Sequence, residues 1–264
     1  MNIMMIGDIC GRPGRRAAAH YIPLLKEEYN LDLIIANGEN SAGGVGITAK
    51  VLDELLEMKI DVITTGNHVW DKKEIFDFID HEERLIRPAN YPPGTPGKGY
   101  HIMSVKNRQV GIINLAGRTF MPPIDCPFRA VDQIISEIRD LCKIIIIDFH
   151  AEATSEKLAL GWYLDGKVSC VAGTHTHIQT ADERILPLGT GFISDLGMVG
   201  PWNSILGVEK EPVIQKFLTG LPVKFNVAAD DDTIFCAIII QIEPHSSKVN
   251  HIIRIQKHLK KGIY

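Results

Sequence analysis

The chain has 264 residues, of which 45% are hydrophobic and 23% are charged, and its formal net charge is -4. These values are typical of a globular protein with a large core, and the slight negative charge argues against a general nucleic-acid or membrane binder. Scattered cysteines, the lack of a basic leader and the lack of any apolar run of transmembrane length predict a cytoplasmic protein with reduced thiols.

The first third of the chain alternates between short apolar runs and amphipathic segments. The apolar runs predict buried strands at residues 2–6, 31–36 and 61–65. The amphipathic segments predict helices at residues 15–29, 49–59 and 71–79. Thr48 is expected to cap the second helix, and Asp71 with Glu74 resembles a capping box for the third. This alternation of strands and helices favours a parallel sheet.

The rest of the chain is more varied. Two loops rich in proline and glycine, at residues 88–99 and 119–127, are expected to cover part of the functional site. Further strands are predicted at residues 101–105, 109–115, 143–148, 168–172, 183–187, 191–194, 233–242 and 248–255. Further helices are predicted at residues 130–141, 154–164 and 211–219. With no clear linker, we expect one domain, residues 1–264, in which two packed sheets have helices outside them.

Polar side chains follow five of the predicted strands. They are, in chain order, Asp8, Glu39 with Asn40, Asn67 with His68, His150, and His175 with His177. Because the carboxyl ends of parallel strands meet at one edge of a sheet, these carboxylate, amide and imidazole groups can converge on a metal site. The last two histidines are two positions apart, so in an extended segment they share a face.

Each group also has a structural alternative. Asp8 could cap a helix, and Glu39 could bind a ribose hydroxyl. His150 could be a hydrogen-bonded core histidine, and the Gly-Asn-His sequence at residues 66–68 could be only a turn. Such groups at five separate strand ends are harder to explain by coincidence than any one of them, so we favour the metal site.

Five motifs together carry a resemblance to a known family. They are Gly7-Asp8-Ile9-Cys10-Gly11-Arg12-Pro13-Gly14-Arg15, Asn37-Gly38-Glu39-Asn40, Gly66-Asn67-His68-Val69-Trp70-Asp71, Asp148-Phe149-His150-Ala151-Glu152-Ala153-Thr154-Ser155-Glu156-Lys157 and Gly173-Thr174-His175-Thr176-His177. In this order they resemble the calcineurin-like metallophosphoesterase superfamily and, more narrowly, its bacterial YmdB-type branch of 2′,3′-cyclic-nucleotide phosphodiesterases. The resemblance implies an α/β fold, a metallophosphoesterase-like four-layer sandwich of two packed mixed β-sheets flanked by helices.

The resemblance also implies a binuclear metal centre. The expected ligands are Asp8, Glu39, Asn40 and His177 on one ion, and Glu39, Asn67, His150 and His175 on the other, with Glu39 as the bridge. Iron or manganese is expected, with zinc or magnesium as alternatives. Cys10 stands where the superfamily usually has its first histidine, and Glu39 where it usually has aspartate. Both departures agree with the YmdB-type branch, and Cys10 is expected to be a loop thiol in preference to a ligand.

The implied reaction is the hydrolysis of 2′,3′-cyclic nucleotides to nucleoside monophosphates by a hydroxide that bridges the metals. His68 would donate a proton to the departing ribose oxygen, while Asp71 is expected to cap a helix in preference to orienting His68. The alternatives are a phosphomonoesterase or nuclease with the same metals, and a regulatory protein that keeps the fold. A dinucleotide-binding enzyme is disfavoured, because the glycine spacing is G-x-x-x-G-x-x-G. Expected partners are a small phosphodiester and further copies of the chain in a homo-oligomer, with no membrane and no stable nucleic-acid partner.

Overall fold

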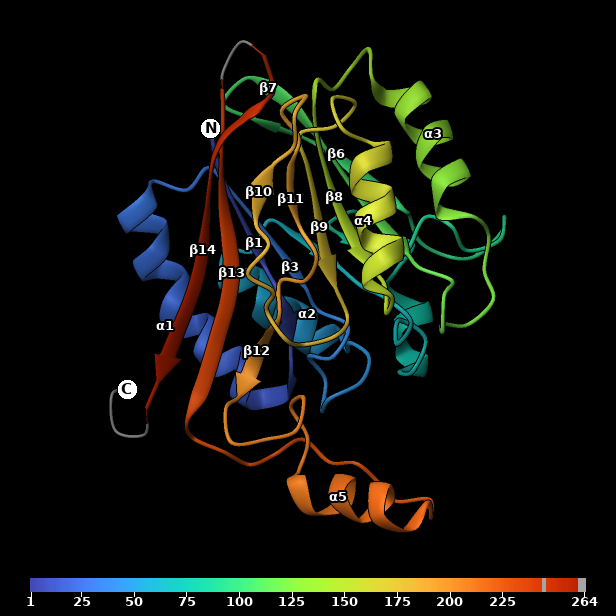
Figure 1. Ribbon diagram of the computed structural model, residues 1–264, viewed down its shortest axis with the longest axis vertical. Helices are drawn as coiled ribbons and strands as arrows, with labels where there is room; N and C mark the ends of the chain where they lie inside the picture. Colours follow the sequence, from blue (N-terminus) through green and yellow to red (C-terminus); the bar gives the residue numbers. More distant parts are fainter. Residues whose placement is uncertain (244–245, 261–264) are drawn as a thin grey trace.

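Two β-sheets pack face to face at the centre of the molecule (Figure 1). The computed structural model describes residues 1–243 and 246–260. The first sheet has the strand order β2-β12-β13-β1-β3-β4-β5, with β14 also paired to β13, and the second has the order β10-β11-β9-β8-β7-β6. Both sheets contain parallel and antiparallel pairs, which confirms the prediction of two packed mixed sheets.

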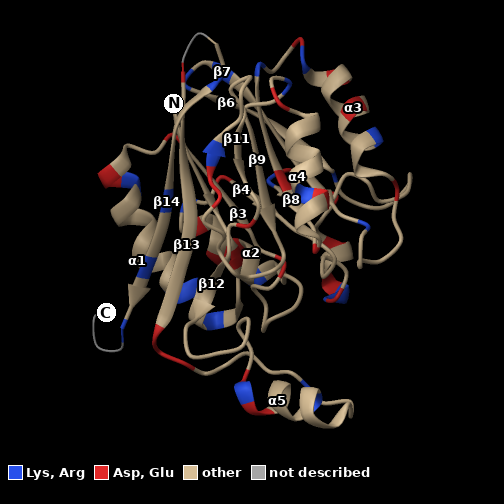
Figure 2. Ribbon diagram, viewed as in Figure 1, with Lys and Arg blue, Asp and Glu red and all other residues tan. Residues whose placement is uncertain are grey.

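The strands of the first sheet come from both ends of the chain. They are β1 (Asn2–Ile6), β2 (Asp8–Ile9), β3 (Leu33–Asn37), β4 (Val62–Thr64), β5 (Leu85–Ile86), β12 (Met198–Pro201), β13 (Thr233–Ile242) and β14 (Val249–Leu259). Strands β1, β3 and β4 are parallel, as the sequence predicts, and β5, which was not predicted, pairs with β4 in the same direction. Strand β13 lies in the interior of the sheet and carries no charged residue, as its uniform colour in Figure 2 shows.

The strands of the second sheet come from the middle of the chain. They are β6 (Tyr100–Val105), β7 (Arg108–Ala116), β8 (Ile144–His150), β9 (Cys170–Thr174), β10 (Arg184–Ile185) and β11 (Gly191–Ile193). Strands β6 and β7, which match the strands predicted at residues 101–105 and 109–115, form an antiparallel hairpin. Its two turn residues, Lys106 and Asn107, have φ of 48° and 63°, the left-handed conformation that a tight two-residue hairpin turn requires at both positions.

Helices cover the outer face of each sheet. Helices α1 (Gly11–Tyr29) and α2 (Ala49–Glu57) pack on the first sheet, and α3 (Pro127–Ile138) and α4 (Thr154–Tyr163) pack on the second. Successive side chains of a strand point to opposite faces. In β1, Met4 and Ile6 therefore contact the helical side, while Ile3 and Met5 enter the core between the sheets. The result is the predicted four-layer sandwich of an α/β protein.

Some predicted elements differ in their limits. Helix α1 begins at Gly11, four residues before the predicted start, because Pro13 lies in the first turn, where a missing N–H leaves no hydrogen bond unmade. Thr48 caps α2, as predicted, by accepting from the Val51 N–H at 3.3 Å. The helix predicted at residues 71–79 is only a short 3-10 helix, η1 (Lys73–Asp77), and Asp71 does not cap it.

Helix α5 (Lys210–Thr219) stands apart from the sandwich, at the bottom of Figure 1. It belongs to the connection between β12 and β13, and Val213 is the one residue that it buries. An antiparallel bridge between Val208 and Val227 ties the base of this extension together. Among the helices of residues 1–243 and 246–260, none has the length and apolar character needed to cross a membrane.

Candidate metal centre

The polar residues predicted from the sequence lie at the carboxyl ends of strands from both sheets. Asp8 begins β2, directly after Gly7, where the backbone carbonyl of Gly197 approaches too closely for any side chain. Glu39 and Asn40 follow β3, and Asn67 and His68 follow β4. His150 is the last residue of β8, and His175 and His177 follow β9. The sequence predicted this convergence at strand ends, and the packing of the two sheets brings the ends together.

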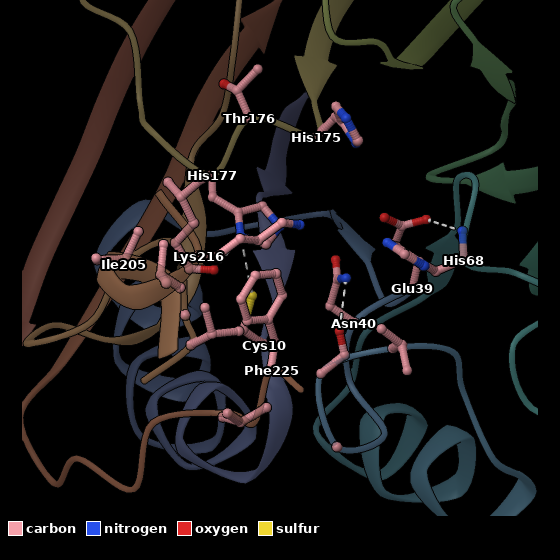
Figure 3. A pocket seen from close by; sticks show the side chains of 18 of the residues that line it. Cys10, Glu39, Asn40, His68, His175, Thr176, His177, Ile205, Lys216 and Phe225 are labelled. Atoms are coloured by element: carbon pink, nitrogen blue, oxygen red, sulfur yellow. Dashed lines mark hydrogen bonds between the residues drawn. The ribbon is translucent and has the colours of Figure 1, made fainter. Parts of the chain in front are cut away.

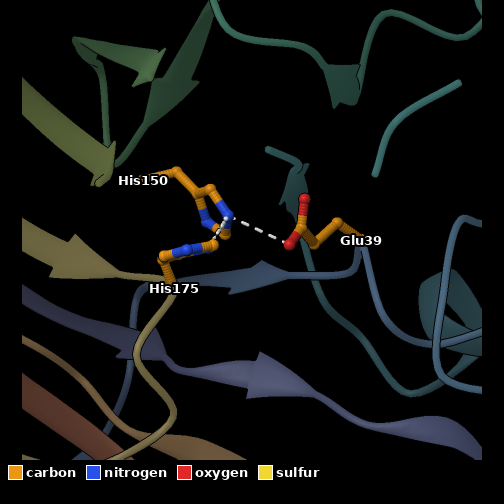
Figure 4. Close-up of side chains that lie close together, drawn as sticks. All are labelled: Glu39, His150 and His175. Atoms are coloured by element: carbon orange, nitrogen blue, oxygen red, sulfur yellow. Dashed lines mark hydrogen bonds and ion pairs between the residues drawn. The ribbon is translucent and has the colours of Figure 1, made fainter. Parts of the chain in front are cut away.

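Glu39, His150 and His175 form a compact group of ligand atoms (Figure 4). One ligand atom from each residue lies within 4.8 Å of the other two. The Nε2 atom of His150 is 3.0 Å from Glu39 Oε1 and 3.0 Å from His175 Nδ1. The side-chain oxygen of Asn67 is also 3.0 Å from this Nε2 atom, so four predicted residues meet at one point.

Hydrogen bonds on the far side of each imidazole set its tautomer. The Thr174 hydroxyl donates to Asp148 Oδ1 at 2.6 Å, so it can only accept from His150 Nδ1, which is 3.0 Å away. On His175, Nε2 lies 3.2 Å from a Glu152 carboxylate oxygen and is therefore the protonated nitrogen. In its neutral form each histidine then presents a lone pair to the centre. Acceptor atoms gathered in this way fit a bound cation, which would take the place of a proton on His150 Nε2.

Asp8, Asn40 and His177 form a second set of acceptors beside the first. His177 Nδ1 is 2.9 Å from the Leu206 carbonyl oxygen and donates to it, which leaves Nε2 as an acceptor 3.8 Å from Asp8 Oδ1. The Asn40 amide group donates to the Gly44 carbonyl at 3.0 Å. The Oδ1 atoms of Asp8 and Asn40 are buried and have no hydrogen-bond partner among residues 1–243 and 246–260. Buried acceptors without partners destabilise a fold by about 1–3 kcal/mol each, and a metal ion would satisfy both.

In the metal-free protein, the buried carboxylates of the candidate centre also favour a positive charge beside them. Burial raises the pKa of Asp8 to about 6. Burial acts against the Glu39 carboxylate as well, but neighbouring His150 lowers the pKa of Glu39 to about 2, and Glu39 in turn raises the pKa of His150 despite its burial. Burial and the charge of His150 lower the pKa of His175 to about 3, so His175 is neutral, as a metal ligand must be.

The loop that carries the last two histidines is held in an unusual conformation. His175 and His177 have φ of 101° and 65°, a left-handed region that non-glycine residues seldom adopt. Asp195 Oδ2 holds the residue between them, accepting from the Thr176 N–H at 3.1 Å and from its hydroxyl at 2.7 Å. The same oxygen accepts from the buried Lys157 ammonium at 2.6 Å.

Lys157 and Asp195 form a buried ion pair for which the sequence predicts no role. Asp195 lies just beyond β11, so the rule that polar residues after apolar strands mark a site would also have selected it. Lys157 lies inside α4 and has no comparable signal in the sequence. Such a buried ion pair can be recognised only from the packing of α4 against β9.

Comparison with known proteins shows the family of the chain. The model of the family described as YmdB-like protein matches residues 4–255. The chain belongs to this YmdB-like family. A protein of Bacillus subtilis (strain 168), named 2′,3′-cyclic-nucleotide 2′-phosphodiesterase, is 52% identical to this YmdB-like chain over 255 residues, covering 97% of the chain and 96% of the relative.

Solved structures confirm the metallophosphoesterase type of fold. A structure described as a novel phosphatase of Mycoplasma pneumoniae superimposes with a TM-score of 0.93 and 31% identity, covering 98% of this chain and 93% of that one. The structure of a hypothetical protein of Thermus thermophilus superimposes with a TM-score of 0.92 and 40% identity, covering 98% of this chain and 99% of that one. The predicted YmdB-type resemblance is therefore confirmed.

His68 lies at the edge of the candidate centre of this YmdB-like protein. Its backbone N–H donates to Glu39 Oε2 at 3.0 Å, and its ring Nδ1 is 2.7 Å from Asp71 Oδ2. The expectation that Asp71 caps a helix is therefore wrong, because its carboxylate engages the imidazole three residues earlier. Figure 3 shows His68 on the wall of a cavity of about 550 Å³ that also reaches Glu39, Asn40 and His177.

Cys10 lies at the candidate metal centre, whereas residues of the two proline-rich loops line another cavity. Cys10 is buried, with its sulfur 3.7 Å from His177 Nδ1, and it lines the cavity. Tyr91 and Cys126, from the loops at residues 88–99 and 119–127, line a different cavity. That these loops cover part of the metal centre stays a prediction.

Proposed function

We propose that the chain is a metal-dependent phosphodiesterase that hydrolyses 2′,3′-cyclic nucleotides to nucleoside monophosphates. The observation that carries this proposal is the convergence of acceptor atoms on His150 Nε2, beside an imidazole–carboxylate pair in the same cavity. The activity for which the Bacillus subtilis relative is named supports the choice of substrate, since identity of 52% extends over nearly the whole of both chains.

The two sets of acceptors would hold two metal ions. Glu39, Asn67, His150 and His175 suit one ion, and Asp8, Asn40 and His177 with the second Glu39 oxygen suit the other. Nitrogen and oxygen ligands without thiolate are compatible with iron or manganese. Bound there, the ions would hold the phosphate oxygens and acidify the attacking water.

His68 is the proposed proton donor to the departing ribose oxygen. Its side chain is 35% exposed, so it can reach a substrate in the cavity, and it does not belong to the group of ligand atoms around His150. Asp71 accepts a hydrogen bond from Nδ1 and fixes the orientation of the imidazole, which directs the other nitrogen to the substrate. A donor that is held by a carboxylate and not by the metal can release its proton without disturbing the ligands.

A substrate panel tests the proposal. The protein is stripped of metal, reconstituted with manganese or iron, and offered 2′,3′-cyclic AMP, 3′,5′-cyclic AMP, 5′-AMP, an aryl phosphodiester and RNA. We expect the 2′,3′-cyclic nucleotide to have the highest kcat/KM. A preference for 5′-AMP would identify a phosphomonoesterase, and a preference for RNA a nuclease. Failure of the protein to retain metal in elemental analysis would contradict the metal centre itself.

A further inference from the structure

The cavity beside the candidate metal centre has two walls of different chemistry. One wall carries polar groups, among them Glu39, Asn40 and His68. The opposite wall is mostly apolar and comes from residues 205–227, which contribute Leu206, Val208, Val213, Phe217 and Phe225 together with the charged Lys216. The volume of about 550 Å³ lies within the range of small-molecule sites. A ligand that fills the cavity must therefore have a polar end and an apolar end.

The apolar wall is built by an extension that lies outside the sandwich. Its base is closed by the bridge between Val208 and Val227 and by the hydrogen bond from the Ala228 N–H to the Gly207 carbonyl at 3.0 Å. In the described part of the chain, neither Phe217 nor Phe225 belongs to a hydrophobic core. These rings are 86% and 43% exposed, so covering them with a ligand would remove apolar surface from water.

Phe225 is placed to offer a ring face to such a ligand. Figure 3 shows its ring reaching into the cavity from the side of Ile205 and Lys216, with Asn40 on the other side. The Lys216 ammonium lies 5.0 Å from the ring centre and makes a cation–π contact with it. Aromatic side chains in this position bind nucleobases by stacking, and they accept every base because each one has a π face.

We propose that Phe225 is a specificity-determining residue on which the base of the cyclic nucleotide stacks. Phe217 lies at the edge of the same apolar wall. This inference rests on the proposed function, because it takes the cyclic phosphate to lie at the metal ligands. In a nucleotide the phosphate and the base are attached to different parts of the ribose. With the phosphate at the polar wall, the base lies against the apolar wall. The chain therefore selects phosphodiesters that carry a base.

The test compares a substrate that has a base with one that lacks it. The substrates are 2′,3′-cyclic AMP and ribose 2,3-cyclic phosphate, and the variants are Phe225→Ala, Phe225→Tyr and Leu218→Ala. Leu218 is the matched control, because it lies on α5 and is 80% exposed but does not line the cavity. Phe225→Ala should lower kcat/KM for the cyclic nucleotide about tenfold or more, while ribose cyclic phosphate changes less than about twofold. Phe225→Tyr and Leu218→Ala should leave both substrates near wild type.

A binding measurement separates this inference from the proposed activity. Calorimetric titration of the metal-loaded protein with 3′-AMP and with ribose 3-phosphate reports the contribution of the base without any turnover. We expect the wild type to bind 3′-AMP more tightly than ribose 3-phosphate. Phe225→Ala should remove this difference in affinity. Equal binding of both ligands by the wild type, or an equal loss for both substrates in Phe225→Ala, would overturn the stacking role. If the wild type hydrolyses neither cyclic phosphate, the proposed function fails, and the binding data still decide the stacking.

Discussion

Replacing Asp8 by asparagine should stabilise the metal-free protein at neutral pH. Asp8 is fully buried, and burial raises its pKa from 3.8 to about 6. The folded protein therefore holds the proton more tightly than the unfolded chain does. A group of this kind stabilises the fold below the unfolded pKa and loses that contribution as pH rises through the folded pKa. The difference between 3.8 and about 6 corresponds to about 3 kcal/mol.

Urea denaturation of metal-stripped protein between pH 4 and pH 8 measures this effect. The free energy of unfolding of the wild type should fall relative to that of Asp8→Asn as pH rises, until the two differ by about 2 kcal/mol more at pH 8 than at pH 4, since pH 4 already lies above the unfolded pKa of 3.8. Asp125→Asn changes an exposed carboxylate away from the centre. Its free energy of unfolding should change with pH in the same way as that of the wild type. With metal present the order should reverse, because the ion favours the charged ligand. Parallel curves for the wild type and Asp8→Asn would refute the reasoning.

Three further substitutions separate turnover, folding and metal binding. His68→Ala should lower kcat by about 10²–10⁴ while metal content by elemental analysis stays unchanged, and loss of metal would instead assign His68 a structural role. Lys157→Met leaves the buried Asp195 carboxylate without its cation and should lower the free energy of unfolding by about 3–5 kcal/mol, measured in urea; a change below about 1 kcal/mol would contradict the importance of this pair. Glu152→Gln should weaken metal affinity about 10–100-fold in competition with a chelator, because the tautomer of His175 is no longer fixed, and unchanged affinity would show that Glu152 has no positioning role.

The residues of the candidate centre were predictable because they follow local rules. Apolar runs of strand length marked β1, β3, β4, β8 and β9, and a polar residue at the end of each marked the positions that the structure brings together. Thr48 was recognisable as a cap, because its side chain accepts a hydrogen bond from Val51, only three residues away. The first third of the chain also revealed its parallel order, since strands joined through helices have few ways to pair.

Long-range packing decided the rest. The sequence of residues 71–74 suits a helix cap, but the structure places the Asp71 carboxylate against His68, and a side chain cannot do both. The ion pair of Lys157 and Asp195 joins residues 38 positions apart, and only the packing of the second sheet brings them together. Phe225 also lies in the irregular segment that follows α5, where no strand or helix pattern marks it. The sequence by itself determined which polar groups gather at the candidate centre, because they follow strands. The tertiary structure determined their partners, because competing hydrogen bonds and ion pairs are settled by which distant segments meet.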